Sequence, residues 1–118
     1  MTIVVDASVA VAWLAQEAGS ARARRLALSE RALVAPDFLL LEVASALTRR
    51  AAGGTVPPGF AGEAVRALRR RRALDLRPSE PLIEGAAALA EQLAHPIYDC
   101  LYLALAQREG AALATFDA

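Results

Sequence analysis

Ile3-Val4-Val5-Asp6 is a continuous run of β-branched apolar residues that ends in a carboxylate. A short run that is apolar at every position is typical of a strand buried on both faces, and we predict a strand over residues 2–5. The acid that follows is unusual there, because an isolated carboxylate is costly to remove from water. Asp6 is therefore expected to be paired, shifted in its pKa or bound to a metal ion.

Three further acids stand beside apolar runs in the same way. Glu42 follows the run 39–41, Asp99 precedes the run 100–103, and Asp117 follows the run 111–116. The four acids are too far apart in the chain to form a local motif, so they can meet only in a cleft built from several segments. Two to four carboxylates in one cleft favour Mg²⁺ or Mn²⁺, and such a site suits metal-assisted hydrolysis of a phosphodiester.

Strand-like and helix-like patterns alternate along the chain. Strands are predicted over 2–5, 33–35, 73–76 and 111–115, and helices over 8–16, 21–30, 36–50, 60–72, 80–94 and 98–109. This alternation predicts an α/β fold in which a small parallel sheet is covered by helices on both faces. Ligands of such sheets bind at the carboxyl ends of the strands, and Asp6 and Asp117 each directly follow a predicted strand.

Local signals set the predicted boundaries of several elements. Pro36 suits the first turn of a helix, and Ser79 suits a helix N-cap. Leu26 and Leu28 are expected to face inward from the helix over 21–30. Gly110 is expected to end the helix over 98–109.

The aromatic and basic residues that stand out are assigned structural roles. Trp13 and Tyr102 occupy apolar helix positions and are expected to make core or dimer contacts. His95 lies in a predicted loop and is expected at the surface. Arg49 and Arg50 are expected to be the charge that favours a helix C-terminus.

The composition indicates one soluble domain and excludes several kinds of chemistry. The chain has 118 residues, of which 56% are hydrophobic and 22% charged, and its formal net charge is zero. It contains no Lys, which excludes a phosphate-binding loop with Gly-Lys-Ser/Thr and Schiff-base chemistry. One His and one Cys are too few for the usual zinc sites. The single cysteine, Cys100, permits no internal disulfide and fits a reducing cytoplasm, and no apolar stretch reaches the roughly 18 residues of a membrane span.

Four segments of the chain together carry a resemblance to a known family. They are Val4-Val5-Asp6-Ala7-Ser8, Leu41-Glu42-Val43-Ala44-Ser45-Ala46-Leu47, Tyr98-Asp99-Cys100-Leu101-Tyr102-Leu103-Ala104-Leu105-Ala106 and Thr115-Phe116-Asp117. Each segment alone is a weak signal, but all of them in this order, in so short a chain, are specific. They resemble the signatures of the PIN domain, and the likeness is closest to the VapC-type toxins of prokaryotic toxin–antitoxin pairs.

This resemblance implies a fold, a site and partners. It implies a single PIN-like domain over residues 1–118, short at its C-terminus because relatives usually continue through a further strand or helix. The implied catalytic acids, which bind Mg²⁺ or Mn²⁺, are Asp6, Glu42, Asp99 and Asp117, with Ser8 and Thr115 in support. The implied activity is cleavage of RNA by a homodimer that a cognate antitoxin protein inhibits.

Two other functions remain open. A phosphatase or phosphoacceptor of the haloacid-dehalogenase type could use Asp6 as its nucleophile, but such sites need a second Asp two residues later, where this chain has Ser8, and they use a Lys. A non-catalytic PIN-like domain could instead act as a binding module within an antitoxin or DNA complex. Metal dependence separates this module from the nuclease, because only the nuclease needs Mg²⁺ or Mn²⁺.

Overall fold

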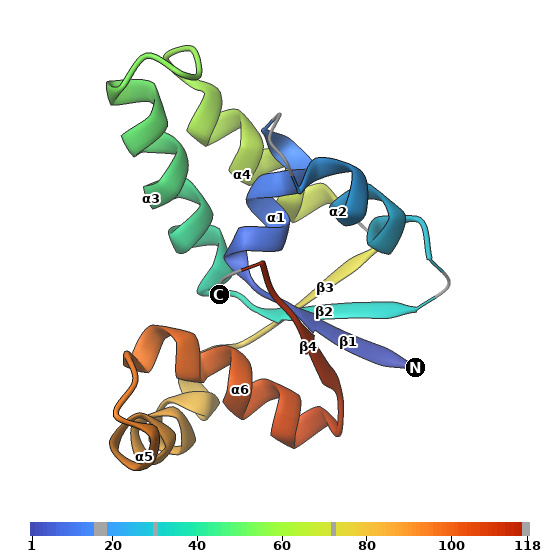
Figure 1. Cartoon of the computed structure of the whole chain (residues 1–118), viewed down its shortest axis with the longest axis vertical. Helices are drawn as coiled ribbons and strands as arrows, with labels where there is room; N and C mark the ends of the chain where they lie inside the picture. The colour runs from blue at the N-terminus through green and yellow to red at the C-terminus, as the bar shows by residue number, and fades with distance from the viewer. Residues whose placement is uncertain (16–18, 30, 72, 117–118) are drawn as a thin grey trace.

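The structure is a computed structural model that describes residues 1–15, 19–29, 31–71 and 73–116, and its centre is a parallel sheet. The strands β1 (Thr2–Val5), β2 (Ala32–Pro36), β3 (Leu74–Arg77) and β4 (Ala112–Ala114) lie in the order β3-β2-β1-β4. In β1, Val4 pairs with Val34 of β2 and with Leu113 of β4. Because the strands are parallel, their carboxyl ends meet at one edge of the sheet (Figure 1).

Helices cover both faces of this sheet. The helices α1 (Ala7–Leu14), α2 (Ser20–Ala27), α3 (Leu39–Ala52) and α4 (Phe60–Arg70) lie on one side. The other side carries α5 (Ile83–Leu93), which follows a short 3₁₀ turn at Glu80–Leu82, and α6 (Ile97–Glu109) (Figure 1). The expected α/β architecture is therefore confirmed. No helix in the described ranges is long and apolar enough to span a membrane.

The apolar residues of β1 are buried as their pattern predicts. Val4 and Val5 have no exposed surface, and Ile3 is buried as well. They belong to the same core as Val9 of α1 and Leu47 of α3. Burial on both faces explains why the run contains no polar residue until the strand ends at Asp6.

Two predictions at the ends of β2 and β3 are wrong: the helix start at Pro36 and the helix cap by Ser79. The same pair of hydrogen bonds between the two turns accounts for both. Pro36 is the last residue of β2, and α3 begins only at Leu39. Ser79 makes no side-chain capping bond to its own helix. Instead its hydroxyl accepts the N–H of Phe38 at 2.9 Å, and its own N–H donates to Asp37 Oδ1 at 3.1 Å. The polar groups of these two turns therefore satisfy each other across the edge of the sheet.

The helix boundaries differ from the predicted ones by a few residues. The predicted helix ends at residues 16, 30 and 72 lie outside the described residues, and the described helices end earlier, at Leu14, Ala27 and Arg70. Leu28 follows the end of α2 and is 85% exposed, so its predicted inward position is wrong. The helical period does not apply to a residue beyond the last turn. Gly110 ends α6 as expected, in the left-handed conformation with φ 61°.

We expect two leucine substitutions to separate the core from the surface. Leu47→Ala should lower the free energy of unfolding by about 2–5 kcal/mol, because it leaves a cavity at a fully buried position. Leu28→Ala should change it by less than about 0.5 kcal/mol, because this side chain already lies in water. Urea denaturation followed by circular dichroism measures both, and equal losses would contradict the described packing.

Candidate active site

Asp6 lies where β1 ends and α1 begins, at the carboxyl edge of the sheet. Its backbone N–H donates to the carbonyl oxygen of Ala114 at 3.2 Å, which continues the pairing with β4. Its Oδ1 accepts the N–H groups of Ser8 at 3.0 Å and Val9 at 3.3 Å, so the side chain caps α1. The residue is only 8% exposed, and these donors stabilise its negative charge.

Ser8 connects this carboxylate to the segment after β4. Its hydroxyl donates to Asp6 Oδ1 at 2.5 Å and accepts the N–H of Phe116 at 2.9 Å. Thr115 lies between Ala114 and Phe116, so its position is set by a hydrogen bond on each side. The sequence prediction placed Ser8 and Thr115 beside the acids, and the structure brings both of them to Asp6.

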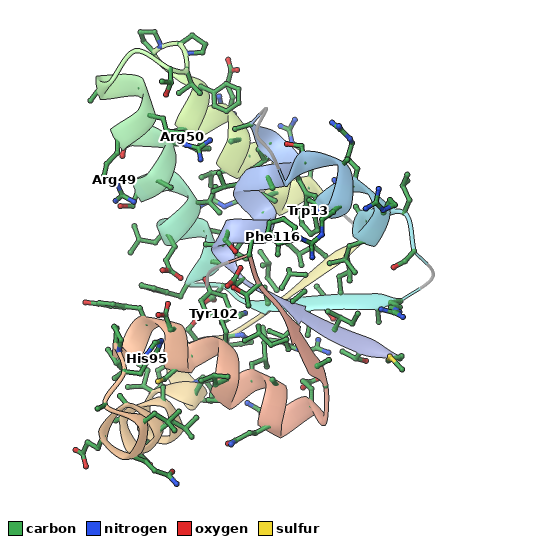
Figure 2. The ribbon with its side chains drawn as sticks, viewed as in Figure 1. Trp13, Arg49, Arg50, His95, Tyr102 and Phe116 are labelled. Atoms are coloured by element: carbon green, nitrogen blue, oxygen red, sulfur yellow. The ribbon has the colours of Figure 1, made fainter. Side chains whose placement is uncertain are left out.

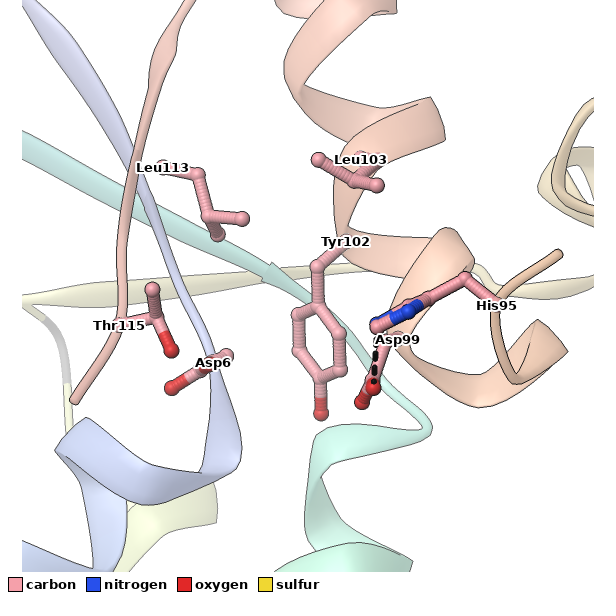
Figure 3. Close-up of a pocket in the computed structure, with 7 residues that line it drawn as sticks. All are labelled: Asp6, His95, Asp99, Tyr102, Leu103, Leu113 and Thr115. Atoms are coloured by element: carbon pink, nitrogen blue, oxygen red, sulfur yellow. Dashed lines mark ion pairs between the residues drawn. The ribbon is translucent and has the colours of Figure 1, made fainter. Parts of the chain in front are cut away.

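A cavity of about 170 Å³ opens beside Asp6. It is lined by Asp6, His95, Asp99, Tyr102, Leu103, Leu113 and Thr115 (Figure 3). Asp6 and Thr115 reach it from the sheet, and Asp99 reaches it from the first turn of α6. The structure thus brings together two of the four predicted acids, although 93 positions separate them in the chain. We call this space the acid cavity.

Glu42 does not line the acid cavity, but it is tied to its wall. Glu42 lies in the first turn of α3, and its Oε1 accepts a hydrogen bond from the hydroxyl of Tyr102. Tyr102 belongs to α6, is 2% exposed and lines the cavity between its Asp6 and Asp99 sides (Figure 3). The expected common pocket for all the acids is therefore divided by one tyrosine side chain. The remaining predicted acid, Asp117, lies outside the described residues.

The Tyr102 hydroxyl stays protonated because of its surroundings. Burial raises its pKa far above the ordinary value, and the hydrogen bond to Glu42 raises it further. Negative charge also contributes, from three acids: Glu42, Asp6 and Asp99. Like charges near an acidic hydroxyl disfavour its ionised form, so all three carboxylates raise the pKa of Tyr102.

His95 also holds an acid of the site. Its Nε2 lies 3.1 Å from Oδ2 of Asp99, and the two side chains are 52% and 49% exposed. The expected surface position of His95 is correct, but its contact with Asp99 was not predicted. The spacing carried a signal. Asp99 and Tyr102 are three residues apart on α6 and so share a face of this helix, and His95 lies four residues before Asp99. His95, Asp99 and Tyr102 follow this spacing.

A second hollow lies next to the acid cavity and contains positive charge. It is lined by Ala7, Ser8, Val11, Glu42, Arg49, Arg50 and Phe116, and has a volume of about 380 Å³. Arg49 and Arg50 stand along α3, beyond Glu42 (Figure 2). Ser8 contacts Asp6 of the acid cavity and also lines this hollow, so it stands between the carboxylate of Asp6 and the guanidinium groups of Arg49 and Arg50. This arrangement suits a polyanion whose reacting phosphate enters the acidic side.

The donor set of the acid cavity fits a hard cation. Within the described ranges, no three His, Cys, Asp or Glu side chains gather closely enough to hold a metal by themselves. Mg²⁺ does not require this, because it commonly binds one or two carboxylates, keeps several waters and completes its shell with substrate phosphate. Asp6 and Asp99, with the Thr115 hydroxyl on the same wall, supply oxygen ligands of that kind. Zinc sites are built mainly from His and Cys side chains, of which the lining of this cavity contains only His95.

We expect Tyr102→Phe to remove a stabilising bond without changing the packing. At neutral pH the loss should be about 1–2 kcal/mol, because the bond is made to a charged group that is only partly buried. Above roughly pH 10 the unfolded chain releases the tyrosine proton and the folded protein keeps it, so the wild-type free energy of unfolding falls as pH rises. This fall should be much smaller in the variant. Urea denaturation of the wild type and the variant, at neutral pH and above roughly pH 10, measures this difference in the free energy of unfolding.

Tyr98→Phe is the control for this experiment, because it removes an exposed hydroxyl from the neighbouring turn of α6. The chain contains no Lys, and the Cys100 thiol, whose pKa is raised by burial, contributes to the alkaline fall of all three proteins alike. If Tyr98→Phe removed the alkaline fall and Tyr102→Phe did not, the described contact between Tyr102 and Glu42 would be wrong.

Comparisons with known proteins agree with this architecture. The profile of the PIN domain family matches residues 3–118. Ribonuclease VapC3 of Pyrobaculum aerophilum is 31% identical over 118 residues, which covers 99% of this chain and 90% of that protein. The crystal structure of VapC20 from Mycobacterium tuberculosis, described as a toxin that cleaves the sarcin–ricin loop, superposes with a TM-score of 0.77. It is 23% identical and covers 98% of this chain and 89% of its own, which supports the fold. Because the profile and the relative both span almost the whole sequence, this chain belongs to the PIN domain family.

Proposed function

We propose that this protein is an endoribonuclease that hydrolyses RNA phosphodiester bonds, and that it is the toxin of a VapBC-type toxin–antitoxin pair. The observation that carries the proposal is the acid cavity, where Asp6 and Asp99 come together from opposite ends of a PIN domain. The 31% identity to a protein named as a ribonuclease supports the same activity. The arginines of the adjacent hollow supply the charge that an RNA backbone needs.

Metal dependence is part of this proposal. Asp6 and Asp99 would hold Mg²⁺ or Mn²⁺, with Glu42 and Asp117 as the further acids predicted from the sequence. When bound, such a cation lowers the pKa of water and offsets the charge that builds on the phosphoryl group. The chain's own residues position the acids: Ser8 holds Asp6, Tyr102 holds Glu42 and His95 holds Asp99.

The proposed setting is a cytoplasmic homodimer that binds a cognate antitoxin. The buried, unpaired Cys100 fits a reducing compartment. Apolar side chains on α5, such as Ile83 at 48% exposure and Leu93 at 52%, offer surface for a second chain. Light scattering of the purified protein, alone and with its antitoxin, measures both assemblies.

One observation favours the alternative of a non-catalytic binding module. Glu42 is held by Tyr102 and does not line the acid cavity, so the described part of the site has fewer converging acids than the sequence predicted. A module of this kind would bind its partners equally well with and without Mg²⁺.

We expect Asp6→Asn, Glu42→Gln and Asp99→Asn each to reduce RNA cleavage by roughly 100-fold or more, because each removes a carboxylate that would hold the metal ion needed to offset charge on the reacting phosphate. The fold should persist, since Asn at position 6 can still cap α1. Total RNA is incubated with each protein with and without Mn²⁺, and the cut ends are mapped. Glu63→Gln, which neutralises an exposed acid on α4, is the control. Wild-type cleavage by Asp99→Asn would remove Asp99 from the site.

We also expect Mg²⁺ to raise the melting temperature of the wild-type protein. An ion that binds only the folded site stabilises it by mass action, by about 2.7 kcal/mol at a concentration of 100 times its Kd. The double variant Asp6→Asn with Asp99→Asn should melt at a higher temperature than the wild type without metal, because repulsion between like charges is relieved, and should not respond to Mg²⁺. A wild-type melting temperature that stays constant up to many millimolar Mg²⁺ would argue against the metal site.

A further inference from the structure

Two aromatic rings stack at the edge of the sheet, outside the acid cavity. The rings of Phe38 and Tyr98 have centroids 5.4 Å apart and planes 8° apart. Phe38 immediately precedes α3, and Tyr98 is in the first turn of α6, so the stack forms where these two helices start. Phe38 packs against the core, whereas Tyr98 is 56% exposed. Packing against Phe38 orients the tyrosine ring, and more than half of the residue's surface remains exposed to solvent.

This stack forms one wall of a separate hollow. The hollow has a volume of about 370 Å³ and is lined by Phe38, Leu41, Glu42, Ser45 and Tyr98. Leu41 is 63% exposed, so the apolar surface is not covered by the chain itself. We call this space the aromatic hollow. Glu42 connects it to the acid cavity, because Glu42 lines the aromatic hollow and accepts a hydrogen bond from Tyr102, which lines the acid cavity.

A cation stands at the end of the aromatic hollow. Arg49 Nη1 donates to the Ser45 hydroxyl at 2.7 Å, one turn further along α3. The hollow therefore combines an open aromatic face, an aliphatic side chain, a hydroxyl and a guanidinium group. These groups match the parts of a nucleotide: a ring that can stack, polar edges and a phosphate.

We propose that the aromatic hollow binds an unpaired RNA base next to the phosphodiester that is cut, with the base stacked on the open face of Tyr98 and Arg49 contacting an adjacent phosphate. This inference rests on the proposed ribonuclease activity and adds to it a contact for one base at Tyr98. A paired base cannot offer its face to Tyr98, so the contact requires a base that is unpaired.

A protein partner fits this hollow less well than a base does. Protein interfaces bury about 800 Å² on each side and have cores depleted of charge. This hollow has two strongly exposed apolar side chains, Leu41 and Tyr98, its lining includes Glu42, and Arg49 contacts it through Ser45. A second copy of the chain seated here is therefore the competing outcome in the experiment below.

The experiment compares Tyr98→Ala with Tyr98→Phe on a short single-stranded RNA that contains a mapped cleavage site. Tyr98→Ala should raise KM by roughly 10-fold or more with a much smaller change in kcat, because stacking onto an aromatic ring is lost. Tyr98→Phe keeps the ring and should recover most of this loss. Leu28→Ala, which trims an exposed apolar side chain just after α2, is the matched surface control.

A second set of RNAs tests whether a base is what Tyr98 contacts. Each RNA carries one abasic nucleotide, placed in turn at the positions that flank the cut. At one position the missing base should raise the KM of the wild type as much as Tyr98→Ala raises it for intact RNA. The same missing base should hardly change the KM of Tyr98→Ala. Equal effects of the abasic nucleotide on both proteins at every position would overturn the proposal. So would a KM effect of Tyr98→Ala that accompanies a change in oligomeric mass, since this outcome assigns the hollow to a second copy.

Binding measured without turnover keeps the inference separate from the activity. The fluorescence anisotropy of a labelled single-stranded RNA in EDTA reports affinity even if no RNA is cut. One possible outcome is that the wild-type protein does not cleave RNA, yet binds the abasic strand more weakly than the intact strand, and Tyr98→Ala binds the intact strand more weakly than the wild type does. This outcome would contradict the proposed function and support the base subsite. If the wild-type protein cleaves RNA but binds intact and abasic strands equally, the proposed function is supported and the base subsite is contradicted. If Tyr98→Ala does not fold, the abasic strands with the wild type decide the question.

Discussion

The carboxylate oxygen Oδ1 of Asp6 links the junction between β1 and α1 to the segment after β4, which is far away in the sequence. It accepts two backbone N–H groups at the start of α1, which have no partner within the helix itself. It also accepts the hydroxyl of Ser8, which in turn accepts the N–H of Phe116. The end of β1, the first turn of α1 and the segment after β4 are thereby held around one negative charge. The wall of the acid cavity depends on this arrangement, because Thr115 is placed by it.

The acids of the site repel one another, and each has a neighbour that holds it. Ser8 holds Asp6, Tyr102 holds Glu42, and His95 holds Asp99. Tyr102 is the central contact, since its buried hydroxyl keeps its proton among three carboxylates and separates Glu42 from the cavity that Asp6 and Asp99 line. A neutral donor at this position satisfies Glu42 without adding a charge that would require desolvation.

Asp99 lines one of the three hollows and Glu42 lines the other two, and the three hollows differ in chemistry. The acid cavity supplies oxygen ligands, the hollow with Arg49 and Arg50 supplies positive charge, and the aromatic hollow supplies a ring face. In a chain with no net charge, local placement of the arginines replaces a general attraction for nucleic acid. The binding of RNA to such a surface depends on how phosphates and bases are distributed over these hollows.

The sequence by itself determined β1, the alternation of strands and helices, the end of α6 at Gly110, and the acids beside apolar runs. These features follow from interactions between residues close in the chain, such as apolar periodicity and helix capping, which a sequence displays directly. Only the tertiary structure decided that Ser79 bonds to Phe38, that Tyr102 reaches Glu42 across 60 positions, and that Asp6 shares a cavity with Asp99 and not with Glu42. Such contacts depend on how α3 and α6 pack against opposite faces of the sheet, and no local pattern encodes the distance between two side chains that approach from different helices.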